Sequence, residues 1–580
     1  MEKNPFAVIN PEAQRPEDIA SLYVDVIEDM TLITSDRHTF IHGARGTGKS
    51  MLLRYLEPKV QIAAGKYTTV NSLPFFAIHV PLKKGSFISE LQRLKGDMYN
   101  YFAEHFLVSL ILAKTFMQID GVCPDVGYAR GFYSNFLKRR LELLGYSNEF
   151  SIESISFERI AKIFEELNIV AVQYLKRHWN KSPSVPYDGP LFGYTDLLLP
   201  ALEECISFDF MPNGPFFLML DDADKTQIEV QKIINTWVSY RTNAVVALKI
   251  ATQLEYQTHS TISGTYIEDP HDFCEIDLTT IYSPTTSNFT QRIRSILEKR
   301  FRIHSLSGTP DDFFPKDIEQ EKAIMAIAEE LKKKHRDGQG KGHRENDDVI
   351  RYARPAYMAS LTGSKKASST FSYAGFDSIA TLANGIIRWF LEPASLMYNK
   401  QKTLNGEKEV TEVAVHVQDE ILLAWSQKFI MEGNERLQEL INSPSPDETQ
   451  KNTALMLLKL IEGLGRLFRK ILLSGLSERR VFSIMLSTEP DEELAKVLSM
   501  GVKWGFLQFK YIGTKEGLGR NPQYILSRRL APFYKLDAYG FAGNLSVTAE
   551  TLKIACRDPD AFVRARFAEK SSGQEQLRLI

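Results

Sequence analysis

The chain has 580 residues, more than a single hydrophobic core usually serves, so we expect two to four domains. Hydrophobic residues make up 43% of it and charged residues 24%, a globular composition that argues against extensive disorder. The formal net charge of −2 excludes a surface that is basic throughout, so only a local basic patch could support nucleic-acid binding.

Three features of the sequence indicate the protein's compartment: its cysteines, its N-terminus and its most apolar segment. Its four cysteines lie far apart and form no C-x-x-C pair, so neither a zinc knuckle nor a disulfide framework is indicated. The N-terminus lacks the apolar core of a secretory signal. The apolar stretch 101–117 is interrupted by Glu104, His105 and Lys114, which predicts a buried helix rather than a membrane span. We therefore expect a cytoplasmic protein with no membrane partner.

After an N-terminal segment, 1–36, residues 37–285 are predicted to form an α/β core. The expected strands, in chain order, are 39–42, 74–81, 215–220, 244–251 and an edge-like 274–278. Helices are expected at 49–56 and 227–241, and strands that alternate with helices predict a parallel sheet. Roughly 170 residues lie between Ser50 and Asp221, more than a βαβ connection needs, so much of 95–195 is predicted to be a helical insertion.

The pattern after the core is predominantly helical. Residues 286–445 are predicted to form a helical lid with connecting helices, and the charged, glycine-containing stretch 332–348 is predicted to be a solvated loop. The Ser-Pro-Ser-Pro stretch 443–446 reads as a linker. Within 446–540 a helix, a strand, a helix and two strands predict a winged-helix domain, and 541–580 is expected to be a C-terminal tail.

The strongest local signal is G-x-x-x-x-G-K-[ST] at 43–50, between an expected strand and an expected helix. In such a P-loop the glycines let successive backbone N–H groups face the phosphates. Lys49 neutralises the β- and γ-phosphates, and the Ser50 hydroxyl binds magnesium. The alternative, an ordinary glycine-rich turn, is disfavoured by this context. We expect ATP with Mg²⁺ to be bound by Gly43, Ala44, Arg45, Gly46, Thr47, Gly48, Lys49, Ser50 and Met51.

An acidic pair, Asp221-Asp222, ends the third expected strand. Ligands of open α/β sheets bind at the carboxyl ends of the strands. We therefore expect Asp221 to hold the magnesium, directly or through water, and Asp222 to orient the attacking water or act as a base. The alternative is an aspartate-rich helix cap, for which Asp224 is a candidate.

The order of glycine loop, aspartate-ended strand, helical lid and winged helix resembles the origin-recognition-complex-like branch of AAA+ ATPases and its relatives among bacterial STAND-type switch ATPases. The resemblance covers most of residues 35–535 as architecture, and only the P-loop and the acidic strand are specific at residue level. It implies an oligomerising ATPase that controls a partner or effector protein, with a role in antiphage or mobile-element defence. Two alternatives are a DNA-binding initiator or loader, and a structural scaffold with a degenerate nucleotide site.

The resemblance also implies roles for single polar residues. Thr252-Gln253 stands where the family keeps its sensor 1 residue, which makes Gln253 a catalytic candidate. The segment 383–388 is similar to the start of the sensor 2 helix, so Arg388 would contact the γ-phosphate from the lid. Arg241 is a candidate arginine finger acting in trans. The alternatives are a strand-end turn, a surface arginine on an amphipathic helix and a C-terminal helix charge, respectively.

Three further expectations concern rate, adenine and DNA. The acidic pair is Asp-Asp where the AAA+ pattern has Asp-Glu, and the shorter carboxylate predicts slow hydrolysis or a nucleotide-held switch. The segment 4–6 could pack against adenine, or it could be a strap that contacts no ligand. The winged helix is only mildly basic: its second helix carries Lys496 and Lys503 beside acidic residues, and Arg528-Arg529 follow the ribbon.

Overall fold

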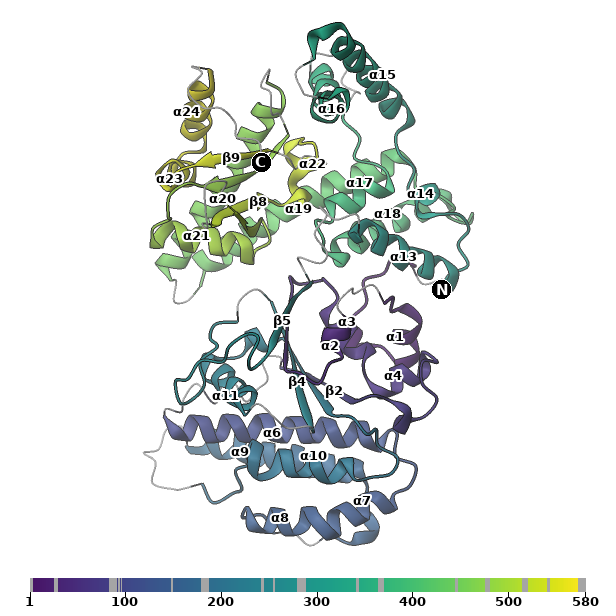
Figure 1. The fold of residues 1–580 in the computed structure, drawn as a ribbon, viewed down its shortest axis with the longest axis vertical. Helices are drawn as coiled ribbons and strands as arrows, with labels where there is room; N and C mark the ends of the chain where they lie inside the picture. The colour runs from purple at the N-terminus through teal and green to yellow at the C-terminus, as the bar shows by residue number, and fades with distance from the viewer. Residues whose placement is uncertain are drawn as a thin grey trace. The chain divides into compact units, whose positions relative to one another are not determined.

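The structure is a computed structural model, and it divides into two compact units (Figure 1). The parallel-sheet unit is Ile9–Tyr282, and the helix-rich unit combines Met1–Val8 with Ser283–Ile580. The residues that the structure describes are 4–25, 30–82, 91, 94, 96–147, 150–178, 187–240, 245–253, 256–278, 288–340, 344–362, 370–443, 447–474, 480–513, 520–539 and 543–571.

Five parallel strands form the centre of the parallel-sheet unit, in the order β2-β3-β4-β1-β5. Their bounds are β1 Thr39–His42, β2 Phe76–Pro81, β3 Phe216–Asp221, β4 Val246–Thr252 and β5 Cys274–Asp277. Every predicted strand of the core is present, and β5 is at the edge, as predicted. Strands β2, β3 and β4 are buried along nearly their whole length, as expected of a sheet that helices cover on both faces.

Helices pack around this sheet. On β3 lies α3, which also contacts α1 and α4, whereas α6 packs on β2 and on α11. The helices outside the insertion are α1 Pro16–Leu22, α2 Met30–Ile33, α3 Lys49–Tyr55, α4 Pro58–Ala63 and α11 Ile228–Ser239. Figure 1 shows α6, α9 and α10 gathered together, away from α1, α3 and α4.

The predicted insertion is helical and shares its core with the sheet. Its helices are α6 Asp97–Asp120, α7 Gly127–Phe132, α8 Lys138–Leu143 and α9 Phe157–His178, and α10 Leu199–Ile206 follows just beyond the predicted end at 195. Phe102 and Phe116 of α6 and Phe164 of α9 belong to the same buried cluster as Leu218 of β3. Among the described residues α6 alone has the length and apolarity of a membrane span, but 72% of its most apolar window is buried inside the protein. It is the core helix that the sequence predicts.

The helix-rich unit begins with a run of helices. Its helices up to the C-terminal sheet are α13 Asn288–Ile303, α14 Pro310–Phe313, α15 Ile318–Lys334, α16 Glu345–Thr362, α17 Phe376–Leu382, α18 Ile387–Asn405, α19 Val415–Ile441 and α20 Glu448–Leu472. The prediction of a loop at 332–348 is wrong for most of that stretch. Helix α15 extends to Lys334, a helical turn follows, and α16 starts at Glu345. Arg336 donates to Glu345 at 2.8 Å while its side chain stays 65% exposed, so the charges are solvated as predicted but belong to helical segments.

The C-terminal part of this unit holds a four-stranded sheet of order β7-β8-β6-β9. Its elements are β6 Val481–Leu486, α21 Glu492–Lys503, β7 Leu507–Gly513, β8 Arg520–Leu526, α22 Ala531–Tyr534, β9 Gly543–Val547, α23 Ala549–Arg557 and α24 Pro559–Ser571. The predicted helix, strand, helix and ribbon are present in that order. In addition β9 pairs with β6 in parallel, and α23 and α24 pack on α20. The described residues beyond 541 are therefore structural parts of this domain. The linker positions 444–446 lie outside the described residues.

The N-terminal residues 4–8 are fastened into the helix-rich unit. Phe6 is fully buried, and Asn4 donates its amide to Asn399 Oδ1 at 2.8 Å. Arg300 Nη1 donates to the carbonyl of Pro5 at 2.8 Å. The Phe6 ring contacts the rings of Phe301, Phe313, Phe314 and Tyr398. Phe6 thus serves as a core residue, as the strap alternative predicts.

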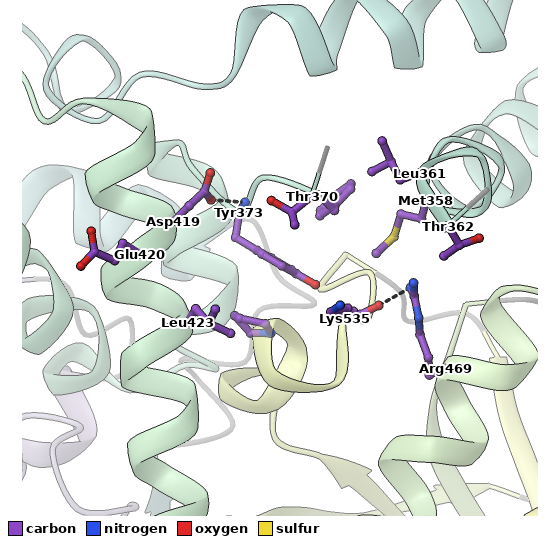
Figure 2. Close-up of a pocket in the computed structure, with 12 residues that line it drawn as sticks. Met358, Leu361, Thr362, Thr370, Tyr373, Asp419, Glu420, Leu423, Arg469 and Lys535 are labelled. Carbon is purple, nitrogen blue, oxygen red and sulfur yellow. Dashed lines mark hydrogen bonds between the residues drawn. The ribbon is translucent and has the colours of Figure 1, made fainter. Parts of the chain in front are cut away.

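A cavity of about 370 Å³ lies within the helix-rich unit, with mostly apolar walls (Figure 2). At its edge Asp419 of α19 accepts the N–H of Tyr373 at 2.6 Å. The Tyr373 hydroxyl is buried and donates to the carbonyl of Leu536 at 2.8 Å. Burial raises the pKa of Asp419 to about 6. The polar groups at this cavity therefore form hydrogen bonds that link neighbouring segments of the chain.

The raised pKa makes Asp419 a source of pH-dependent stability. The pKa of an unfolded aspartate is about 3.9, so between about pH 4 and 6 the folded protein holds a proton that the unfolded chain releases. Stability from this group is therefore present below pH 4 and is lost as the pH rises through 6. Asp419→Asn keeps an acceptor for Tyr373 without the charge. We expect it to raise the free energy of unfolding at pH 7 by on the order of 1 kcal/mol. Urea unfolding at pH 4 and 7 checks this, because a pH-independent difference would contradict it.

Candidate nucleotide-binding site

The glycine loop between β1 and α3 has a backbone that its glycines make possible. Gly46 and Gly48 have φ angles of 95° and 105°, which side-chain-bearing residues rarely adopt. A Cβ on Gly43 would lie 2.8 Å from Thr47 Oγ1, so a third glycine is needed for close packing. The Thr47 hydroxyl in turn donates to the carbonyl of Ala44 at 2.9 Å. The sequence therefore forms the strand, loop and helix that a P-loop requires.

Lys49, the first residue of α3, directs its ammonium group into this loop. Its Nζ donates to the carbonyl of Gly43 at 2.5 Å and to that of Ala44 at 3.3 Å, and the residue is 7% exposed. Burial lowers the pKa of Lys49, and the carboxylates of Asp221 and Asp224 act in the opposite direction. A buried ammonium held by loop carbonyls is suited to receive a polyphosphate, which would replace weak neutral acceptors with charged ones.

Asp221, at the end of β3, is buried and ionised. It is 2% exposed, His79 Nε2 donates to its Oδ2 at 3.1 Å, and the Asp222 N–H donates to its Oδ1 at 2.9 Å. Burial would raise the pKa of Asp221, but hydrogen bonds from His79 and Ser50 and the charge of Lys49 outweigh it and hold this pKa below its ordinary value. The structure thus brings the two predicted magnesium ligands, Ser50 and Asp221, into contact.

The donor set at this position fits Mg²⁺ bound with a nucleotide. Magnesium commonly takes one or two protein oxygens and completes its octahedron with phosphate oxygens and water. The Ser50 hydroxyl and the Asp221 carboxylate supply such oxygens. Within the described part of the chain there is no group of three or more His, Cys, Asp or Glu residues able to hold a metal alone.

Asp222, the predicted water-orienting residue, is engaged in an ion pair. Its φ of 59° is left-handed, a conformation that aspartate tolerates better than most residues. Its Oδ2 lies 2.5 Å from Lys225 Nζ. Lys225 was not identified from the sequence as a partner of Asp222, although a lysine three residues after an aspartate is a signal for a local ion pair.

The end of β4 lies between the P-loop strand and the acidic strand, because β4 separates β1 from β3 in the sheet. Thr252 is fully buried, and its Oγ1 lies 2.6 Å from His42 Nδ1. The Gln253 N–H donates to Asp224 Oδ1 at 2.9 Å. Asp224 therefore ties the end of β4 to the acidic segment, and it does not cap α11, whose N-cap residue is Gln227. The catalytic role of the Gln253 side chain stays a prediction.

The remaining predicted site residues are two residues at the glycine loop and two arginines far from it in the chain. Arg45 is exposed, and Met51 is in the first turn of α3. Arg388 is in the first turn of α18, in the helix-rich unit. Arg241 lies outside the described residues. The roles expected of both arginines remain predictions.

His79, which the sequence predicts to be a core histidine, contacts Asp221, the predicted magnesium ligand. Its side chain is 5% exposed, and its partner Asp221 is 142 positions away in the chain. We expect His79→Leu to raise the Mg²⁺ concentration needed for ATP binding by about tenfold, because residues that orient a metal-binding carboxylate commonly matter to that extent. His79→Gln, which keeps an N–H donor, is expected to lose less. Titrating Mg²⁺ at fixed ATP measures both, and an unchanged midpoint in His79→Leu would show that Asp221 needs no such support.

Comparison with known proteins adds a family to this geometry. No curated protein gives a significant match. The sequence model of the ORC-CDC6-like family matches residues 4–546, a span that contains the P-loop, the acidic strand, helices α13 to α20 and most of the C-terminal sheet. Because the match covers nearly the whole chain, the protein belongs to the ORC-CDC6-like family of ATP-binding AAA+ proteins.

Proposed function

We propose that the protein is a nucleotide-controlled switch ATPase. It binds MgATP in the parallel-sheet unit, hydrolyses it slowly and assembles into a homo-oligomer that controls a partner or effector protein. The observation that carries this proposal is the contrast between two neighbouring aspartates. Asp221 is buried, ionised and in contact with Ser50, whereas Asp222 is bound to Lys225. The residues proposed to bind MgATP are thus in place, whereas Asp222, proposed to orient the attacking water, is held in an ion pair.

The proposed chemistry is in-line attack of water on the γ-phosphate. Lys49 would neutralise charge on the phosphates, while Ser50 and Asp221 would hold the magnesium that bridges them. Asp222 would orient the water once Lys225 releases it, and its short side chain gives it limited reach. Arg388 would add positive charge from the lid, and Gln253 would contribute as the sensor 1 residue. Both of these assignments come from the family resemblance.

Titration calorimetry with ATP and ADP, each with and without Mg²⁺, tests the proposed nucleotide binding. Hydrolysis assays test the proposed slow turnover. Lys225→Ala should free Asp222 and raise the turnover number by roughly tenfold, a modest part of what a well-placed base contributes. Asp222→Asn should remove this gain. Lys66→Ala, an exposed lysine outside the site, is the matched control. Unchanged turnover in Lys225→Ala with intact ATP binding would refute the restraint, and the absence of ATP binding would refute the whole proposal.

The competing function is a DNA-binding initiator or loader that uses the C-terminal domain as a winged helix. The order of helix, strand, helix and ribbon supports that domain assignment. However, Arg528 and Arg529, counted as basic residues near the ribbon, are 0% and 4% exposed and so are unavailable to phosphates. Lys496 donates to Glu492 at 2.7 Å, which offsets its charge. We therefore favour a protein partner over DNA. Duplex binding across a salt series, with and without ATP, separates the two, since tight ATP-dependent binding would favour the loader.

A role in antiphage defence is the biological context that we propose, and family resemblance supports it. Phage plating on cells that carry the parent gene or its Lys49→Ala variant tests it. Equal plating on both strains would argue against a nucleotide-dependent defence role.

A further inference from the structure

The cavity of about 370 Å³ in the helix-rich unit is large enough for a small organic molecule, because ligand pockets in proteins commonly start at about 300 Å³ (Figure 2). Its apolar walls come from segments that are far apart in the chain. They are Met358 and Leu361 of α16, Phe371 before α17, Leu423 of α19 and Pro532 of α22. Met358 and Pro532 are buried, whereas Leu423 is 42% exposed. These walls suit the apolar body of a ligand.

The acidic groups at the cavity already have partners within the protein. Asp419 accepts the N–H of Tyr373 at 2.6 Å, and Glu420 forms an ion pair with Lys400. Figure 2 shows Asp419 and Arg469 on opposite sides of Tyr373. The acidic groups therefore do not call for a cationic ligand, and they do not pair with the arginine of the cavity.

The basic groups at the cavity have no such counter-charge. Arg469 of α20 is half-buried, and its Nη1 donates to the carbonyl of Lys535, whose own side chain is exposed. Among the described residues neither Arg469 nor Lys535 forms an ion pair with a carboxylate. A partly buried charge without a partner is unfavourable, and an anion that binds it offsets that cost. The planar guanidinium retains a second edge, Nε and Nη2, whose geometry matches a carboxylate.

We propose that this cavity binds a small amphipathic carboxylate. Its apolar body would lie against Leu361, Phe371 and Leu423, and its carboxylate would be held by Arg469 and Lys535. The ligand would contact α16, α19 and α20 at once, so binding stabilises the helix-rich unit. Every residue of this site belongs to that unit, whereas the glycine loop belongs to the other. The inference therefore stands or falls independently of the proposed nucleotide binding.

Calorimetric titration of octanoate into the full chain tests the inference, with octan-1-ol and acetate as comparison compounds. Octanoate carries both the apolar chain and the carboxylate, octan-1-ol carries only the chain, and acetate carries only the head group. We expect octanoate to bind about tenfold more tightly than either, as a hydrogen bond to a charged group contributes at least that much. Saturating octanoate should also raise the thermal unfolding midpoint of the protein.

Variants of the two basic residues test the anion contact. Lys535→Gln is the variant least disruptive to the fold, because Lys535 is exposed, and Arg469→Gln removes the charge but keeps an N–H donor for the carbonyl of residue 535. Arg469→Gln should weaken octanoate binding about tenfold, Lys535→Gln should weaken it less, and neither should weaken octan-1-ol binding. Arg466→Gln, on the same helix but outside the cavity, is the matched control and should change neither affinity.

A wall variant tests the apolar contact. Leu423→Trp adds volume at the cavity and should weaken the binding of octanoate and octan-1-ol alike. Equal affinities of the parent for octanoate and octan-1-ol, or parent-like octanoate binding in both Arg469→Gln and Lys535→Gln, would overturn the inference. The absence of octanoate binding to the parent would overturn it as well. Each of these results would leave the proposed nucleotide binding untouched.

Discussion

Replacing Lys49 by alanine is expected to lower the affinity for MgATP by about 10²- to 10³-fold. The ammonium group is 7% exposed and lies inside the glycine loop, where charged phosphate oxygens would replace the carbonyls of Gly43 and Ala44 as its partners. A hydrogen bond to a charged group contributes about 1.5–3 kcal/mol, and two of them account for a loss of this size. Calorimetric titration of ATP into the variant measures it.

The Lys49→Ala variant should remain folded, which makes its binding loss interpretable. Lys49 donates hydrogen bonds to the carbonyls of Gly43 and Ala44 in its own loop, and burial lowers its pKa, so its charge is costly in the folded protein. We expect a thermal unfolding midpoint close to that of the parent. Lys66→Ala, an exposed lysine of the same unit, should bind ATP normally. Parent-like ATP affinity in Lys49→Ala would favour the scaffold with a degenerate nucleotide site.

Replacing Arg529 by alanine is expected to lower the free energy of unfolding of the helix-rich unit by about 3–5 kcal/mol, as large truncations in a packed interior do. The guanidinium lies 4.2 Å from the ring centre of Trp425 and 4.3 Å from that of Phe429, and the residue is 4% exposed. Truncation would remove these cation–π contacts and leave a cavity between rings of α18 and α19. Because Trp389 and Trp425 border that cavity, tryptophan fluorescence during denaturant unfolding reports on it.

Two controls separate the cavity from the charge. Arg529→Met fills most of the same volume without a charge, so it should cost less than Arg529→Ala. Arg436 lies 5.3 Å from the ring centre of Trp504 but is only partly buried, so Arg436→Ala should cost less than about 1 kcal/mol. Equal destabilisation by Arg529→Ala and Arg436→Ala would show that the enclosed position of Arg529 contributes nothing special.

The core of the fold could be predicted from the sequence because its signals are local. Each strand of the parallel sheet is a short apolar run, and the glycine loop is a contiguous motif in a strand-to-helix context. The strand β9 was not predicted, because it is only five residues long and its partner strand β6 lies about sixty positions earlier in the chain. The stretch 332–348 was misjudged because charge alone does not distinguish a solvated loop from helices whose charges pair.

The candidate site was predictable only as far as its motifs extend. Lys49, Ser50 and Asp221 follow from residue type and spacing, and the structure brings them together. The support that His79 gives to Asp221 depends on the pairing of β2 with β3, which no local pattern encodes. The sequence suggests that Arg529 is exposed, because arginine usually lies at the surface. Its burial depends on aromatic residues of helices that are distant in the chain.

The fastening of residues 4–8 has a consequence for where the helix-rich unit can be cut out of the chain. Residues 4–8 belong to that unit although the whole parallel-sheet unit follows them in the sequence. A fragment that starts at residue 283 would lack Phe6, the fully buried ring that contacts Phe301, Phe313 and Phe314. Such a fragment should therefore unfold more easily than the same fragment supplied with a peptide of the first eight residues.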